Sequence, residues 1–331
     1  MYNGDMSESA RKNHVLGWVL LVLLAVVVVV GALNWRWCYD FIRGMGYSAT
    51  GEMSGIVAKL DLTDRGEFLF RASRPELLGR DEFNSHCVEG ESETAVLGCY
   101  TKDTVYVYDI TDKELDGIRE LTTAHELLHA VYARMSEEER GRISAELSKV
   151  LAKNPAGLKE ELENYDRAER DEELYVRAGT EVADLPEALE RHYAEIFRNQ
   201  DAVAGYYNKY ISVFRQLEAE LETLETEMNG LSATIDNLSA EYETRMKQLN
   251  DEITSFNNCA MVAGCFSSQG EFQARRAALV GEQGELEAKY NQISQMIDTY
   301  NSKVEKYNAD VVRGQSLNRK INSTSEPEGI K

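Results

Sequence analysis

A heptad pattern fills the last third of this 331-residue chain and constrains its fold more than any other feature. From Tyr207 to Leu238, apolar residues recur at alternating steps of three and four, and the pattern continues to Phe256 with one stutter. A second such run extends from Phe272 to Val311. Two heptad helices joined by a short loop predict an antiparallel coiled-coil hairpin over residues 203–312, with the loop at 257–270. The polar residues 313–331 are predicted to be a disordered tail.

An uncharged apolar run from Val15 to Leu33 predicts a transmembrane helix after an N-terminal tail of residues 1–14. Nineteen helical residues extend about 29 Å, which matches a hydrocarbon core of about 30 Å. Trp18 lies near one end, and Trp35, Trp37 and Tyr39 follow the other end, as interfacial aromatic residues do. The alternative is a cleaved signal peptide, but its apolar core is shorter and ends in small residues. The run therefore favours an uncleaved signal-anchor.

The cysteines indicate the side of the membrane on which the bulk of the chain lies. Cys87 and Cys99 are close in sequence, as are Cys259 and Cys265. Two such local pairs favour disulfides, which persist in oxidising compartments. The alternative is four reduced core residues. The disulfide interpretation predicts a single-pass membrane protein with a cytoplasmic N-terminus and an extracytoplasmic C-terminal domain. The net charge of −21 excludes nucleic acid as the main partner, because phosphates select for Lys and Arg.

Between the anchor and the heptads, the chain is predicted to be mainly α with a small α+β part. Residues 34–60 contain several Gly and Ser and are interpreted as a linker. Residues 61–200 are predicted to form one domain. Within it, Thr104–Asp109 alternates like a strand, and residues 114–135 show helical periodicity. Further helices are expected at about 137–153, 157–178 and 186–198.

The predicted helix contains the motif H-E-x-x-H, as His125-Glu126-Leu127-Leu128-His129. Residues four apart share one helix face, so both imidazoles can bind one Zn²⁺. Glu126 lies one step round the helix, where its carboxylate can act on a metal-bound water. The motif predicts that His125 and His129 are metal ligands and that Glu126 is the catalytic base.

The strand followed by an H-E-x-x-H helix resembles the zincin metallopeptidases, over about residues 100–200. The metzincin extension of the motif is absent, because Tyr132 and Met135 stand at its Gly and His positions. The remaining resemblance is to the gluzincin group, which implies a third zinc ligand from a glutamate on a later helix. Glu173 is the preferred candidate, since it shares a helix face with Val176 and Arg177 beside two apolar residues. The alternatives are Glu172, Glu181 and His192.

The resemblance implies a membrane-anchored zinc peptidase that hydrolyses peptide bonds by Glu126-assisted attack of a zinc-bound water. Thr104–Asp109 is expected to hold an extended peptide substrate by strand addition. The alternative function is a membrane-tethered coiled-coil adaptor in which the HELLH site is inactive or binds zinc only structurally. In either case the heptads leave open a homodimer or another coiled-coil partner.

Overall fold

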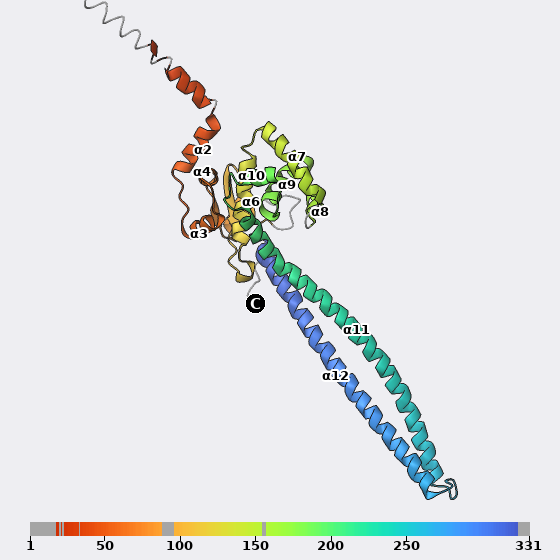
Figure 1. Cartoon of the computed structure of the whole chain (residues 1–331). Coiled ribbons are helices and arrows are strands. Elements are labelled where there is room, and N and C mark those ends of the chain that lie inside the picture. Colours follow the sequence, from red (N-terminus) through yellow and green to blue (C-terminus); the bar gives the residue numbers. More distant parts are fainter. Residues whose placement is uncertain are drawn as a thin grey trace, which may run out of the picture. The chain divides into compact units, whose positions relative to one another are not determined.

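A computed structural model describes residues 18–19, 21, 23–32, 34–87, 96–153 and 157–323. The chain divides into two compact units. Unit 1 consists of Met1–Ser212 and Arg319–Lys331, and unit 2 of Val213–Asn318. The described residues are mainly helical, as predicted, with one small sheet (Figure 1).

The sheet of unit 1 has three short strands in the order β1-β3-β2. They are β1 (Glu76–Leu78), β2 (Gly98–Thr101) and β3 (Thr104–Tyr108). A two-residue turn at Lys102 and Asp103, both with positive φ, joins β2 to β3 and fixes the register Thr101↔Thr104. On its other side, β3 pairs in parallel with β1. The predicted strand therefore exists, but it is the central strand, so the expectation that Thr104–Asp109 adds a substrate strand is wrong.

The helix α6 (Ile118–Tyr132) is the centre of unit 1 and packs against α9 (Arg167–Glu181), α3 (Gly51–Leu60), α4 (Asp64–Ser73), β2 and β3. Its Ala124, Leu127 and Leu128 side chains have no exposed surface. The other elements after β1 are α5 (Arg80–His86), η1 (Lys113–Leu115), α7 (Glu137–Lys153), α8 (Leu158–Glu161), η3 (Leu162–Asn164) and α10 (Glu187–Tyr193).

The linker predicted at residues 34–60 is instead largely helical. It contains α2 (Trp35–Met45) and α3 (Gly51–Leu60), which precede α4 (Asp64–Ser73). Met53, Ile56 and Leu60 follow one another at steps of three and four and are buried in the core. Of the Gly and Ser residues that suggested a linker, Gly51, Ser54 and Gly55 lie on the exposed face of α3. The prediction failed because an amphipathic face needs only three apolar residues in a helix this short.

No single helix within the described residues is both long and apolar enough to cross a membrane. Leu23–Ala32 and Trp35–Met45 meet the length and composition criteria only as a pair, and they are bent by 82° relative to each other. Residues 15–17, 20, 22 and 33 of the predicted anchor lie outside the described residues, as does the tail 1–14.

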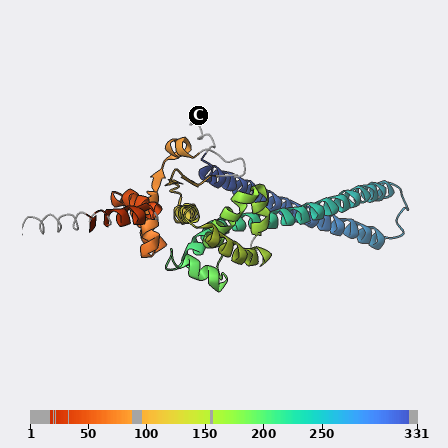
Figure 2. The same cartoon turned by 90° about the horizontal axis from the view of Figure 1, so that it is seen from above.

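Unit 2 contains most of the long helices α11 (Gln200–Ala260) and α12 (Gln269–Ile321), which lie side by side (Figures 1 and 2). The helices are antiparallel, because residues early in α11 pair with residues late in α12. Lys306 pairs with Glu220 at 2.9 Å, Lys303 with Glu227 at 2.6 Å, and Lys289 with Glu241 at 2.5 Å.

The disordered tail predicted at residues 313–331 is wrong for its first part. Helix α12 continues to Ile321, which is 7% exposed in unit 1. Lys320 pairs with Asp112 at 2.6 Å, and Asn84 donates a hydrogen bond to the Ser323 carbonyl. Residues 324–331 lie outside the described residues.

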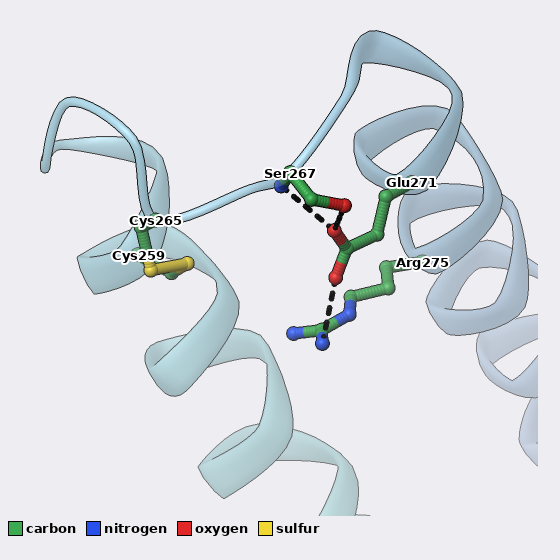
Figure 3. Close-up of a disulfide and its surroundings, with 5 residues drawn as sticks. All are labelled: Cys259, Cys265, Ser267, Glu271 and Arg275. Carbon is green, nitrogen blue, oxygen red and sulfur yellow. Dashed lines mark hydrogen bonds and ion pairs between the residues drawn. A yellow bond between two sulfur atoms is a disulfide. The ribbon is translucent and has the colours of Figure 1, made fainter.

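Both predicted disulfides are present. Cys87–Cys99 joins the end of α5 to β2, and Cys259–Cys265 closes the loop between α11 and α12 (Figure 3). Beside the second disulfide, the Ser267 backbone N–H and hydroxyl both donate to the Glu271 carboxylate. Arg275 pairs with the same carboxylate at 2.9 Å, and the Ser268 hydroxyl caps α12 by accepting a hydrogen bond from the Glu271 N–H at 3.1 Å.

Candidate metal centre

The H-E-x-x-H segment lies in the middle of α6, as the sequence predicts. The side chains of His125 and His129 are 20% and 19% exposed, whereas Leu127 and Leu128 on the other side are fully buried. The leucines hold that face of the helix in the core. The histidines are therefore presented together on the accessible face.

Helix α9 packs against α6 and brings Glu173, which is 4% exposed, to the two histidines. One ligand atom from each of His125, His129 and Glu173 can be chosen so that all lie within 4.8 Å of one another. The His125 Nε2 and His129 Nε2 atoms are 3.3 Å apart. Glu173 Oε2 lies 3.5 Å from His129 Nε2, and Glu173 Oε1 lies 3.7 Å from His125 Nε2.

These separations fit a tetrahedral metal ion. Bonds of about 2.0–2.1 Å at tetrahedral angles place neighbouring ligand atoms about 3.3–3.4 Å apart. The 3.3 Å between the two Nε2 atoms and the 3.5 Å between Glu173 Oε2 and His129 Nε2 are close to that value, whereas the 3.7 Å contact to His125 is made by the other oxygen of the Glu173 carboxylate. The donor set of two imidazoles and one carboxylate leaves a fourth position open, which is the arrangement of catalytic zinc sites.

Neighbouring side chains orient two of these ligands. Glu172 Oε1 lies 2.8 Å from His129 Nδ1, so the Nε2 atom is the one directed at the metal position. The Arg177 Nε–H donates to Glu173 Oε1 at 2.7 Å. A carboxylate on the outer nitrogen of a metal-binding histidine fixes the ring and its tautomer. Glu172 thus supports a ligand instead of being the third ligand.

The pKa values of the three candidate ligands are shifted in different directions. Burial lowers the pKa of His125 to about 3. Burial also disfavours the charged form of His129, but hydrogen bonds to Glu172 and Glu173 outweigh it and raise the pKa of that ring to about 10. The desolvation of Glu173 is likewise outweighed by the two histidines, and its pKa is lowered. Without metal, a proton on His129 is therefore what balances the buried carboxylates.

Glu126 is 5% exposed and lies directly against the start of β2. A Cβ atom placed on Gly98 would lie 2.6 Å from Glu126 Cγ and 2.7 Å from Glu126 Oε1. Only a residue without a side chain permits this approach. Gly98 was not predicted as a site residue, and the only signal for it in the sequence was a glycine at the start of a short β segment.

The remaining candidate ligands lie elsewhere. Glu181 pairs with Arg177 at 3.7 Å and is not part of the three-residue group. His192 Nε2 lies 3.1 Å from the Tyr175 hydroxyl, and burial lowers the pKa of this histidine. The Tyr193 hydroxyl donates to the Tyr175 carbonyl. This buried histidine–tyrosine cluster supports α9 from the side of α10.

Comparison with protein-family models, curated proteins and solved structures finds no significant match to this chain. The interpretation of the site therefore depends on its own geometry.

Proposed function

We propose that the chain is a membrane-anchored, zinc-dependent peptidase. The observation that carries the proposal is the convergence of His125, His129 and Glu173 at separations that suit one tetrahedral ion. The donor set and the HELLH motif resemble those of the zincins, and Zn²⁺ is the ion that such a set favours.

In this proposal His125, His129 and Glu173 hold the ion, which when bound lowers the pKa of water and polarises a carbonyl group. Glu126 accepts the proton of the attacking water and delivers it to the leaving amine. Its burial beside β2 restricts the positions that the carboxylate can take, as a general base requires.

The substrate is proposed to be an extended peptide bound along β2. Within the described residues β2 is an edge strand, with β3 on one side only, and it begins against Glu126. Backbone groups at a strand edge can pair with an added strand. This replaces β3 as the proposed binding strand.

The membrane anchor and the compartment are also proposals. The uncharged run Val15–Leu33 and the two disulfides support a single-pass protein whose bulk lies in an oxidising, extracytoplasmic space. The heptads of α11 and α12 support a coiled-coil hairpin that is available for a partner.

The test is a comparison of zinc content and peptide hydrolysis in the detergent-purified full chain. The full chain is needed because α2 begins only two residues after the apolar run and is part of unit 1. Wild type should hold about one zinc per chain and cleave a quenched fluorescent peptide library. The His129→Ala variant should lose the zinc, and Glu126→Gln should keep it while the rate falls about 10²–10⁴-fold.

Glu120→Gln is the matched control, because Glu120 is also a buried carboxylate of α6 but pairs with Lys59 at 2.6 Å. It should keep both zinc and activity. Absence of zinc after reconstitution of wild type would overturn the proposal. Bound zinc with no hydrolysis, unchanged by Glu126→Gln, would instead favour the adaptor with a structural metal.

A further inference from the structure

The helix α2 exposes its apolar side chains. Its residues Trp35, Trp37, Phe41, Ile42 and Met45 are 45–64% exposed, and Tyr39 is 38% exposed. Trp37 stacks on Phe41 and on Phe68 of α4, so the aromatic surface is continuous across two helices. A contiguous apolar surface of this kind marks an interaction site.

The charged residues of α2 face unit 1 instead. Asp40 is 2% exposed and accepts hydrogen bonds at 2.9 Å from both Arg134 Nε and Arg134 Nη2. Arg36 pairs with Asp103 at 2.5 Å, and Arg43 donates to the Thr104 hydroxyl at 3.0 Å.

This arrangement reverses that of an ordinary surface helix, whose polar face is turned to water. Rotating α2 to hide its aromatic residues would break the buried Asp40–Arg134 pair, which is strongly unfavourable. The apolar face is therefore held outward by the polar contacts of the inner face.

The composition and direction of α2 match a membrane interface. Trp and Tyr concentrate at the level of lipid headgroups, and interfacial helices present such residues to the lipid. The only acidic residue of α2 is Asp40, which is turned inward, so the outer face carries no carboxylate. The preceding helix Leu23–Ala32 consists of apolar residues and bends by 82° into α2. If that helix follows the membrane normal, α2 lies almost in the membrane plane.

We propose that the outer face of α2 lies on the lipid bilayer as an interfacial helix, in addition to the anchor. Arg134, which holds Asp40, comes two residues after the end of α6. The contact therefore fixes the helix of the metal centre relative to the bilayer surface, so that the substrates are polypeptides close to the membrane. The docking depends on the proposed anchor only in that the anchor brings the bilayer within reach, and the substrate class rests in addition on the proposed peptidase activity.

The test measures the depth of single tryptophans in the full chain reconstituted into phosphatidylcholine vesicles. In a background in which Trp18, Trp35 and Trp37 are Phe, one reporter is placed at a time: Trp18 retained, Trp35 retained, Met45→Trp, or Glu138→Trp on the exposed side of α7. Each reporter is quenched by brominated acyl chains from the lipid and by iodide from the water.

A docked α2 should bring positions 35 and 45 to the same depth, with lipid quenching equal within twofold and little quenching by iodide. A helix that projects from the membrane would place position 45 about 15 Å farther out than position 35. It would then behave like the Glu138→Trp control, and the proposal would be overturned. Protection of position 45 from both quenchers would also overturn it, in favour of a second copy of the chain.

The reporter at position 18 separates failure of the anchor from failure of the docking. Lipid quenching at 35 and 45 without quenching at 18 would retain the docked helix and reject the span. Thermal unfolding of each variant should match that of wild type, because all four reporter side chains are exposed.

Discussion

At the scale of single residues, the two histidines of α6 differ because carboxylates surround only one of them closely. Glu172 lies 2.8 Å from His129 Nδ1, and the pKa of His129 is raised from 6.5 to about 10. A raised folded-state pKa means that the proton stabilises the metal-free fold fully below about pH 6.5, and that this contribution is lost as the pH rises through 10. A metal ligand must be neutral, so zinc competes with this proton.

We expect zinc binding at pH 8 to release the His129 proton, and Glu172→Gln to reduce that release because the variant lowers the pKa of His129. The same variant should weaken zinc binding about 10–100-fold, because the His129 imidazole is then no longer held in one orientation. Calorimetric titrations with zinc in buffers of different ionisation enthalpy give both quantities. Glu169→Gln, an exposed residue of the same helix, is the control. Equal affinity in the two variants would contradict the role assigned to Glu172.

Gly98 gives a second prediction at this scale. The added methyl group of Gly98→Ala would lie 2.6 Å from both Glu126 Cγ and Thr122 Cγ2, so β2 and Glu126 must separate. Peptide hydrolysis should fall at least tenfold, since a small displacement of a catalytic group is costly. Zinc content should be unchanged. Gly79→Ala, whose new Cβ would meet nothing within 4 Å, should hydrolyse peptide at the wild-type rate. Similar rates of peptide hydrolysis for the two variants would show that the close approach of Gly98 to Glu126 does not matter for activity.

The site residues that could be predicted from the sequence are those that lie close together along the chain. His125, Glu126 and His129 occupy one helix, and helical spacing alone places them. Glu173 was selected partly because its neighbours are apolar, and it is buried at the site. Gly98 was not predictable, because its constraint comes from a strand that approaches α6 from a distant part of the fold.

At the scale of elements, α2 is held to unit 1 by a buried ion pair. Asp40 and Arg134 have side chains only 3% and 8% exposed, and Arg134 also donates to the Tyr100 hydroxyl on β2. Removing Asp40 leaves the buried Arg134 with Asp103, 4.0 Å away, as its remaining opposite charge, so the cost is about 3 kcal/mol, the low end of the range for a broken buried ion pair. We expect Asp40→Ala to lower the free energy of unfolding of unit 1 by this amount in denaturant titrations of the full chain. Arg191→Ala, which removes an exposed pair with Glu187, should change it by less than about 0.5 kcal/mol.

The wrong predictions about secondary-structure elements have one physical cause in common. The helices within residues 34–60 and the central place of the strand at Thr104–Tyr108 both depend on contacts with distant parts of the chain. Met53 and Ile56 are core residues only because α3 meets α6. The central position of β3 follows from its pairing with β1, which lies more than twenty residues away. Helix α7, by contrast, has the predicted bounds 137–153 because its own periodicity defines it.

At the scale of the whole molecule, the chain leaves unit 1 at Ser212 and returns to it at Arg319. The heptads predicted two long helices because their pattern is continuous, and α11 and α12 are antiparallel along their length. The return segment was predicted to be disordered because it is polar. Its order comes from contacts within unit 1, including Lys320 with Asp112 and Asn84 with the Ser323 carbonyl.

Unit 1 should therefore bind zinc without unit 2, and it should keep its full stability only if the return segment is kept. Replacing residues 213–318 by a short Gly-Ser linker leaves all ligands of the metal centre and the contacts of residues 319–323 in place. This variant should keep about one zinc per chain and the melting temperature of unit 1. Ending the chain at Ser212 removes the same hairpin and also exposes the surface that Ile321 and Ser323 cover, at 7% and 2% exposure. Its melting temperature should fall by several degrees, because 1 kcal/mol of lost stability corresponds to about 2–4 °C for a domain of this size. Equal melting of the two variants would show that the return segment contributes nothing to unit 1, and loss of zinc from the linker variant would make the hairpin part of the metal-binding fold.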